Sequence, residues 1–227
     1  MGPDDWDNGR TVEVTLSQRF GMSRYQVTEE QFSIWDNIQA KAGSNLPASG
    51  VSWLDCYFFL VGLSGERVKQ SDGREYSLTF PTEAQWEYSC RAGSTTDYCY
   101  GDDEQELSQY AWYGANSGYV RHPVGEKKPN AWGLYDMHGN VWEWCSDWYG
   151  KYPSEPDTDP VGPKVGSNRV LRGGSWDSVA AYCRTADRGH VSPTNRSTDL
   201  GFRLALSSSG IPQSPEADKS SGAVGGS

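Results

Sequence analysis

Apolar and polar residues alternate near the start of the chain, in the manner of a strand that buries one face. Within residues 11–17, the apolar side chains of Val12, Val14 and Leu16 fall on one side. The short stretch at residues 25–27 indicates a second strand. We therefore expect two strands before the first helix.

Three later segments place apolar residues three or four positions apart, which is the spacing of one helix face. Two of them begin with a capping box, in which a threonine and a glutamine three residues later satisfy each other's backbone N–H groups. Thr28 pairs with Gln31 in one box, and Thr82 pairs with Gln85 in the other. Ser52 precedes the remaining segment. The pattern predicts helices over residues 28–35, 53–60 and 82–88.

Small and polar residues that favour turns recur every few positions from about 93 to 133, so this stretch is predicted to be loop. Strand-like segments follow at residues 141–145, 169–175 and 201–206. Because helices are few, strands short and loops long, the chain is predicted to form one α+β domain over residues 1–206. Residues 207–227 are rich in serine, glycine and proline and are predicted to be a flexible polar tail.

The composition indicates a loop-rich domain with an aromatic core. The 227 residues include 10 Trp, 13 Tyr, 6 Phe and 26 Gly, and mean hydropathy is -0.72. The net charge of -10 argues against a nucleic acid partner, because phosphate binding needs a basic face. It also argues against docking on anionic lipid. No apolar run reaches the roughly 18 residues of a membrane-spanning helix.

The first residues and the cysteines bear on location. Residues 1–5 are polar and acidic, unlike a secretory signal. We therefore expect any membrane attachment to come from a lipid anchor upstream of residue 1. The five cysteines include no Cys-x-x-Cys pair, which argues against a zinc site or a disulfide framework. Most are expected to be buried free thiols, and a bridge between Cys90 and Cys99 remains an alternative.

Four ordered motifs carry a resemblance to a known family. They are Phe-Pro-Thr-Glu-Ala-Gln-Trp-Glu-Tyr at 80–88, Asn-Ala-Trp-Gly-Leu-Tyr-Asp-Met at 130–137, Gly-Asn-Val-Trp-Glu-Trp at 139–144, and Arg-Val-Leu-Arg-Gly-Gly-Ser-Trp at 169–176 with Gly-Phe-Arg at 201–203. The chain resembles the formylglycine-generating-enzyme (sulfatase-modifying-factor) family from about Val12 to Leu206. The resemblance implies a C-type-lectin-like fold with a large irregular portion.

The resemblance also implies metal chemistry at two places. The family's oxidases bind copper(I) with two cysteines whose positions match Ser178 and Cys183, so the first thiolate is replaced by a hydroxyl that copper(I) binds poorly. We therefore expect no oxidase activity and no required cofactor. Family members also hold calcium at a turn like the one at Asn140 and Glu143, and hard oxygen ligands suit Ca²⁺. A structural calcium ion is thus possible at these two residues.

A related branch of enzymes holds non-haem iron with several histidines. This chain has only His122, His138 and His190, without paired spacing, so no iron site is predicted.

Residues 177–200 have an unusual composition. Lys, Glu, Gln, Met and Trp are all absent, and every residue type present can be written with a codon that ends in C or T. Randomising the adenines of an asparagine codon yields only such residues. Diversity-generating retroelements make adenine-specific errors of this kind. The surrounding motifs, Arg-Gly-Gly-Ser-Trp at 172–176, Cys-Arg at 183–184, Asn-Arg at 195–196 and Gly-Phe-Arg at 201–203, resemble those of retroelement variable proteins.

The resulting hypothesis is a binding module whose variable region spans about 177–200. Trp176, Phe202 and Leu204 are expected in the core, and Gly173 and Gly174 in a tight backbone turn. Tyr182 and His190 are the expected anchors, because a rigid aromatic ring gives large contact area at low entropic cost. The full predicted binding surface is Asp177, Ser178, Val179, Ala181, Tyr182, Asp187, Gly189, His190, Val191, Ser192, Thr194, Ser197, Thr198, Asp199 and Leu200.

The expected ligand is a variable protein or glycan, and the expected role is a receptor or adhesin at the cell surface. Two alternatives remain open at this point. One is an enzyme of the formylglycine-generating family with altered or lost oxidase chemistry, and the other is an accessory domain without a ligand. An ordinary polar loop would also explain the composition of residues 177–200.

Overall fold

The computed structural model describes residues 1, 11–36, 43–63, 68–69, 73 and 75–207. The helices are α1 (Glu29–Asp36), α2 (Trp53–Leu63), α3 (Glu83–Arg91), η1 (Glu104–Glu106), α4 (Leu107–Tyr110) and η2 (Ala180–Cys183). The strands are β1 (Val14–Thr15), β2 (Gly21–Met22), β3 (Val68–Lys69), β4 (Glu75–Thr79), β5 (Trp142–Trp148), β6 (Asp157–Thr158), β7 (Arg169–Arg172), β8 (Arg188–Val191), β9 (Leu200–Gly201) and β10 (Ala205–Ser207).

The three predicted helices are present and begin at the predicted caps. In α1, the Thr28 N–H donates to Gln31 Oε1, and the Gln31 N–H donates to Thr28 Oγ1. The same reciprocal pair joins Thr82 and Gln85 at α3. These local bonds satisfy backbone donors that a helix start would otherwise leave free. The capping boxes therefore fix two helix starts from sequence alone.

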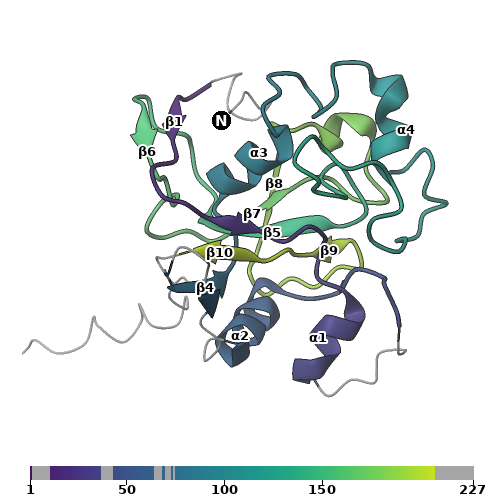
Figure 1. The fold of residues 1–227 in the computed structure, drawn as a ribbon, viewed down its shortest axis with the longest axis horizontal. Coiled ribbons are helices and arrows are strands. Elements are labelled where there is room, and N and C mark those ends of the chain that lie inside the picture. The colour runs from purple at the N-terminus through teal and green to yellow at the C-terminus, as the bar shows by residue number, and fades with distance from the viewer. Residues whose placement is uncertain (2–10, 37–42, 64–67, 70–72, 74, 208–227) are drawn as a thin grey trace, which may run out of the picture.

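Among the described residues, the strands form two four-stranded sheets and one strand pair. One sheet has the order β2-β10-β4-β3, and the other has the order β8-β7-β5-β9. The remaining pair joins β1 and β6 in parallel. In Figure 1, α1 and α2 lie on one side of the strands β5, β7 and β10, and α3 lies on the other.

Several strand predictions need correction. Residues 25–27 form no strand: β2 lies earlier, at Gly21–Met22, and the Val27 N–H donates to the Phe202 carbonyl as an isolated contact. Of residues 11–17, only Val14–Thr15 are in a strand. The strand predicted at 201–206 is divided between β9 and β10, and the strand predicted at 169–175 ends at Arg172. Strand β8 was not predicted. The last strand includes Ser207, and the rest of the predicted tail, 208–227, lies outside the described residues.

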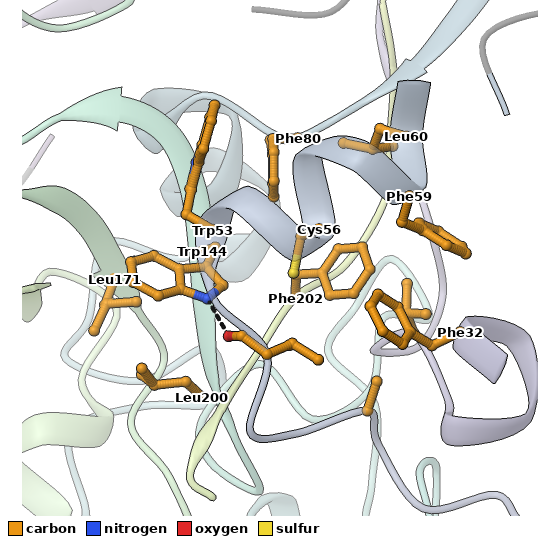
Figure 2. Packing of buried hydrophobic residues seen from close by; sticks show 13 residues of the cluster. Phe32, Trp53, Cys56, Phe59, Leu60, Phe80, Trp144, Leu171, Leu200 and Phe202 are labelled. Atoms are coloured by element: carbon orange, nitrogen blue, oxygen red, sulfur yellow. Dashed lines mark hydrogen bonds between the residues drawn. The ribbon is translucent and has the colours of Figure 1, made fainter. Parts of the chain in front are cut away.

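The main core is aromatic, as the composition predicts. Phe202 is fully buried and its ring lies edge-on to those of Phe32 and Phe59, while Trp53 stacks on Phe80 with ring centroids 4.9 Å apart. Figure 2 shows these rings packed between α2 and the strands, with Trp144 donating from Nε1 to the Val51 carbonyl at 3.0 Å. Fully burying such side chains contributes about 1.5–3 kcal/mol each.

Buried ion pairs join α3 and β5 to later strands. Glu83 of α3 forms ion pairs with Arg172 of β7 and Arg188 of β8, and Glu143 of β5 pairs with Arg203 at 2.6 Å. All five side chains are almost completely buried. Because removing one member would leave a buried charge unpaired, these bridges fix where β7, β8 and the C-terminal segment lie.

Within the described residues, no helix is both long and apolar enough to cross a bilayer.

Candidate ligand-binding surface

The backbone enters the predicted binding segment, residues 177–200, through a tight turn at Gly173 and Gly174. Their φ angles are 97° and 73°, in the left-handed region that favours glycine. A Cβ atom on Gly174 would lie 2.6 Å from Cys183 Sγ. This confirms the predicted tight backbone, and it explains why the chain can fold back on η2 only with glycine at this position.

Residues 177–200 connect the two edges of the central sheet. Strand β8, on one edge, pairs antiparallel with β7, with Val170 opposite His190. Strand β9, on the other edge, pairs in parallel with β5. The residues between β8 and β9 therefore cross from one edge of the sheet to the other.

Regularly spaced contacts attach the binding segment to the rest of the domain. The Gly114 N–H donates to the Ser178 carbonyl at 2.9 Å, and the Thr185 N–H donates to the Asp97 carbonyl at 2.7 Å. Further along, the Leu54 N–H contacts the Pro193 carbonyl, and the Gly50 N–H donates to the Ser197 carbonyl. The backbone of the segment is thus held at several points along its length.

Most predicted binding residues are accessible. The exposed ones are Asp177, Val179, Tyr182, His190, Ser192, Thr194 and Thr198, and the half-exposed ones are Ala181, Gly189, Val191, Ser197 and Asp199. A surface that faces solvent can change without disturbing the core.

Ser178, Asp187 and Leu200 were predicted on the surface, but the structure buries them. Ser178 Oγ accepts the Ser175 N–H at 2.9 Å and so closes the turn after β7. The Asp187 carbonyl accepts from the buried Arg172 guanidinium at 2.6 Å, which draws this residue inward. Leu200 packs in the aromatic core. These three positions belong to the fold rather than to the exposed face.

Two core predictions also need correction. Trp176 is only half-buried, because its indole Nε1 lies at the surface and donates to the Thr198 carbonyl. Leu204 is half-buried as well, whereas Phe202 is fully buried as predicted.

The two predicted anchors come from different elements. Tyr182 lies on η2 with 46% of its surface exposed. His190 lies on β8, where its ring lies against that of Tyr149 with centroids 4.0 Å apart and a tilt of 32°, and its Nδ1 accepts from Asn168 Nδ2 at 2.9 Å. His190 is therefore held in one orientation, and Tyr182 presents an open aromatic face.

A neighbouring loop that sequence reasoning missed adds to this surface. Ser117 Oγ donates to the Trp176 carbonyl at 2.6 Å, and the Tyr119 N–H donates to Ser117 Oγ. Tyr119 is 66% exposed and Val120 is 54% exposed. An apolar pair, Tyr-Val, directly after Gly118 in a polar loop was the available signal. The accessible surface thus includes the loop around Tyr119 beside residues 177–200.

The copper(I) site implied by the resemblance does not fit these residues. Ser178 offers a hydroxyl that is already bonded within the turn, and Cys183 is completely buried against Gly174. Burial raises the pKa of the Cys183 thiol well above its usual value, which disfavours the thiolate that a soft metal needs. No step of oxidase chemistry can be derived from this pair.

The predicted calcium residues both have protein partners. Asn140 Oδ1 accepts the His122 N–H, and its Nδ2 donates to the His122 carbonyl. The Glu143 carboxylate accepts from Arg203 and from Trp86 Nε1. Both polar atoms of the Asn140 side chain are therefore bonded to the backbone of His122. Calcium binding itself stays a prediction.

The cysteines are free thiols, and the buried His138 has structural partners on both ring nitrogens. All five cysteines are free, and all but Cys99 are buried. His138 accepts the Cys99 N–H at Nε2, so its Nδ1 carries the proton and donates to the Cys183 carbonyl. Burial lowers the pKa of His138 to about 4. Among the described residues, no group of three or more His, Cys, Asp or Glu side chains is placed to hold a metal ion.

Comparison with known proteins gives consistent results. Residues 1–208 match the model of the sulfatase-modifying factor enzyme 1-like domain. The chain is 37% identical to the formylglycine-generating enzyme of Streptomyces coelicolor over 178 residues, covering 71% of this chain and 52% of that protein. The mouse formylglycine-generating enzyme is 36% identical over 178 residues, covering 71% of this chain and 44% of that protein. The chain therefore spans about half the length of these curated relatives.

Two solved structures share the architecture. Treponema denticola variable protein 1 superposes with a TM-score of 0.78 and 31% identity, covering 91% of this chain and 90% of that one. PvdO from Pseudomonas aeruginosa superposes with a TM-score of 0.73 and 27% identity, covering 91% and 90% of the two chains.

Proposed function

Because this chain belongs to the family of sulfatase-modifying factor enzyme 1-like domains, we propose that it uses the family fold to present a ligand-binding surface diversified by a retroelement. The similarities confirm the expected fold, an α+β domain of the C-type-lectin-like, formylglycine-generating-enzyme type. The likeness to a treponemal variable protein over 91% of the chain supports the proposal.

The observation that carries the proposal is the division of residues 177–200 into two sets. One set, the frame positions, is buried and holds the segment to the rest of the domain. It includes Cys183 and Arg188, whose guanidinium is hydrogen-bonded to Glu83. Twelve of the fifteen predicted binding positions are exposed or partly exposed, and they use the restricted set of residue types that adenine-directed errors produce. A site that must vary without unfolding needs this separation.

The proposed ligand is a protein or a glycan. Tyr182 and Val179 offer exposed apolar area, and Ser192, Thr194 and Thr198 offer adaptable hydrogen bonding, as in antibody paratopes. The proposed location is the cell surface, where a lipid anchor upstream of residue 1 would hold the domain. The role would be that of a receptor or adhesin.

The gene supplies the first test. Sister clones and the neighbouring DNA should show a near-repeat of codons 170–203, with asparagine codons at the divergent positions. Divergence should concentrate at the exposed positions and spare Ser178 and Leu200. Substitutions spread evenly over all four bases and over buried positions would remove the retroelement origin.

Binding supplies the second test. The purified domain is screened against arrays of surface proteins and glycans, and any ligand is retested with a variant that carries Val179→Ser, Tyr182→Ser and His190→Ser. We expect at least a tenfold loss of affinity, because aromatic anchors dominate such interfaces. The matched control is Ile34→Ser on α1, which is 81% exposed and distant in sequence from the surface. Equal loss in both variants would exclude residues 177–200 as the binding site.

An enzyme with altered chemistry is the second candidate, because the curated relatives are formylglycine-generating enzymes. Copper(I) titration together with a cysteine-peptide oxidation assay separates the two. Tight copper(I) binding with oxidation of the peptide would support the enzyme and remove the binding-module proposal. The Ser178 hydroxyl at the first metal position leads us to expect neither result.

A further inference from the structure

The side-chain amide of Gln26 sits in a cluster of four oxygen atoms. Its Nε2 lies 2.9 Å from the Val141 carbonyl, 3.0 Å from Glu143 Oε1, 3.2 Å from the Gly139 carbonyl and 3.4 Å from the Asp136 carbonyl. The side chain is only 1% exposed. We call this cluster an oxygen cage. The loop before β5 and the second residue of β5 supply the oxygens, and the Gln26 amide nitrogen lies at the centre.

Acceptors outnumber donors in this cage. A carboxamide has two N–H groups, so Gln26 Nε2 cannot donate fully to four oxygens. Gln26 Oε1 and Asp136 Oδ1 are also buried, and neither has a hydrogen-bond partner. The donors at the centre of the cage are thus too few for its acceptors, which is the pattern that a cation would relieve.

The backbone makes the cage rigid. Asp136 and Asn140 both adopt positive φ angles, 60° and 68°, which turns the carbonyls of this loop inward. The Asn140 side chain holds the backbone of His122 with two hydrogen bonds. Gly139 is required, because a Cβ there would lie 2.3 Å from the Trp112 carbonyl oxygen. The oxygens are therefore preorganised whatever occupies the centre.

Hard-cation sites in proteins use this kind of donor set, with carbonyl and carboxylate oxygens at about 2.3–2.6 Å from Ca²⁺. Here the oxygens lie farther out, at hydrogen-bond distance from a nitrogen. The charge of Glu143 is neutralised by Arg203, whose Nη2 and Nε donate to the two carboxylate oxygens at 2.7 and 2.6 Å. A calcium ion and the Gln26 amide nitrogen cannot both occupy the centre.

We propose that the side-chain amide of Gln26 takes the place of a structural cation in this chain, so that the loop before β5 is held without calcium. The amide supplies partial positive charge through two N–H groups, and Arg203 supplies the balancing full charge. Calcium, predicted from the residues Asn140 and Glu143, is then unnecessary here. Replacing the amide nitrogen of Gln26 by an oxygen, as in Gln26→Glu, would make a calcium ion necessary again.

The test compares thermal melting in excess chelator and in millimolar Ca²⁺. The wild-type melting temperature should be the same in both. Gln26→Glu places a carboxylate against Glu143 and three carbonyls, so its melting temperature in chelator should fall by about 5–10 °C. Ca²⁺ should recover most of that loss, because an ion that binds only the folded state stabilises it. Calorimetry should then give one Ca²⁺ per chain.

Gln85→Glu is the matched control. The Gln85 side chain is also hydrogen-bonded to backbone, but as an acceptor of the Thr82 N–H in the capping box of α3, outside the cage. Its melting temperature should not respond to Ca²⁺.

Two results would overturn the proposal. One is a wild-type melting temperature that rises with Ca²⁺ or falls with chelator by several degrees. The other is a folded Gln26→Glu protein that is indifferent to Ca²⁺. If Gln26→Glu does not fold in either condition, Gln26→Ala decides, since it vacates the cage without adding charge. Stabilisation of Gln26→Ala by Ca²⁺ supports the proposal, and no response refutes it.

Discussion

The guanidinium of Arg188, at the start of β8, makes two hydrogen bonds with the carboxylate of Glu83, at the start of α3: Nε to Oε1 at 2.8 Å and Nη2 to Oε2 at 2.6 Å. Both side chains are almost completely buried. This pair fixes the middle of the candidate binding segment to a helix that begins about a hundred residues earlier in the chain. The backbone that carries the exposed residues before and after Arg188 is therefore held in place at Arg188.

Breaking this pair should therefore unfold the domain more readily. Arg188→Met removes the cation and leaves Glu83 with less compensation, and we expect a loss of about 3–5 kcal/mol in the free energy of unfolding. Denaturant titration measures it. Arg196→Met is the matched control, because Arg196 pairs with Asp55 at the surface, where such pairs contribute about 0–1 kcal/mol. Similar losses in both variants would contradict the anchoring role of Arg188.

Substitutions within residues 177–200 should separate by burial rather than by position. Val179→Ser and Thr198→Ala alter exposed side chains, and each should change stability by no more than about 0.5 kcal/mol. Leu200→Ala removes a core side chain and should cost about 2–5 kcal/mol. Ser178→Ala removes the acceptor for the Ser175 N–H and should cost about 1–3 kcal/mol. A uniform response across these four variants would show that the segment does not divide into frame and surface.

The buried histidine should make the domain sensitive to mild acid. The folded-state pKa of His138, about 4, lies below the ordinary value of about 6.5, so the unfolded chain takes up a proton first as pH falls. Stability from neutral His138 is complete above about pH 6.5 and is lost as pH falls towards 4. The loss is about 3 kcal/mol relative to His138→Gln, which does not titrate. Urea titrations of both proteins from pH 7 to 4 measure it, and parallel curves would refute it.

Tyr119 should contribute to ligand binding although it lies outside residues 177–200. Ser117 holds its loop against the backbone of Trp176, and the ring is largely exposed. Tyr119→Ser should weaken a ligand identified by array screening about threefold or more, with an unchanged melting temperature. Val161→Ser, equally exposed in a different loop, is the control. Unchanged affinity in Tyr119→Ser would confine the binding surface to residues 177–200.

Local signals predicted the helices well. Thr28 with Gln31 and Thr82 with Gln85 satisfy backbone groups within one turn, so tertiary contacts are not needed to place those helix starts. Gly174 was predictable for a similar reason, because the turn geometry excludes a side chain. The family resemblance supplied the overall fold, which composition alone limits only to a loop-rich α+β domain.

Long-range contacts explain the errors. Asp187 is polar in sequence, but its carbonyl meets a guanidinium from β7 that only the folded sheet brings near. Strand β8 has no alternating pattern of apolar and polar residues, and it forms through its pairing with β7. Tyr119 joins the surface through Ser117, some sixty residues before Trp176. None of these relationships has a signature within a short window of sequence.

The spacing of the contacts along the binding segment has a consequence for how it can evolve. Backbone bonds at Ser178, Thr185, Pro193 and Ser197 leave only a few residues between successive fixed points. An inserted or deleted residue before β8 would shift its pairing with β7 by one and turn every side chain to the opposite face. The exposed positions of the segment can therefore exchange side chains while its length stays fixed, so any diversification of the proposed surface should proceed by substitution without insertion or deletion.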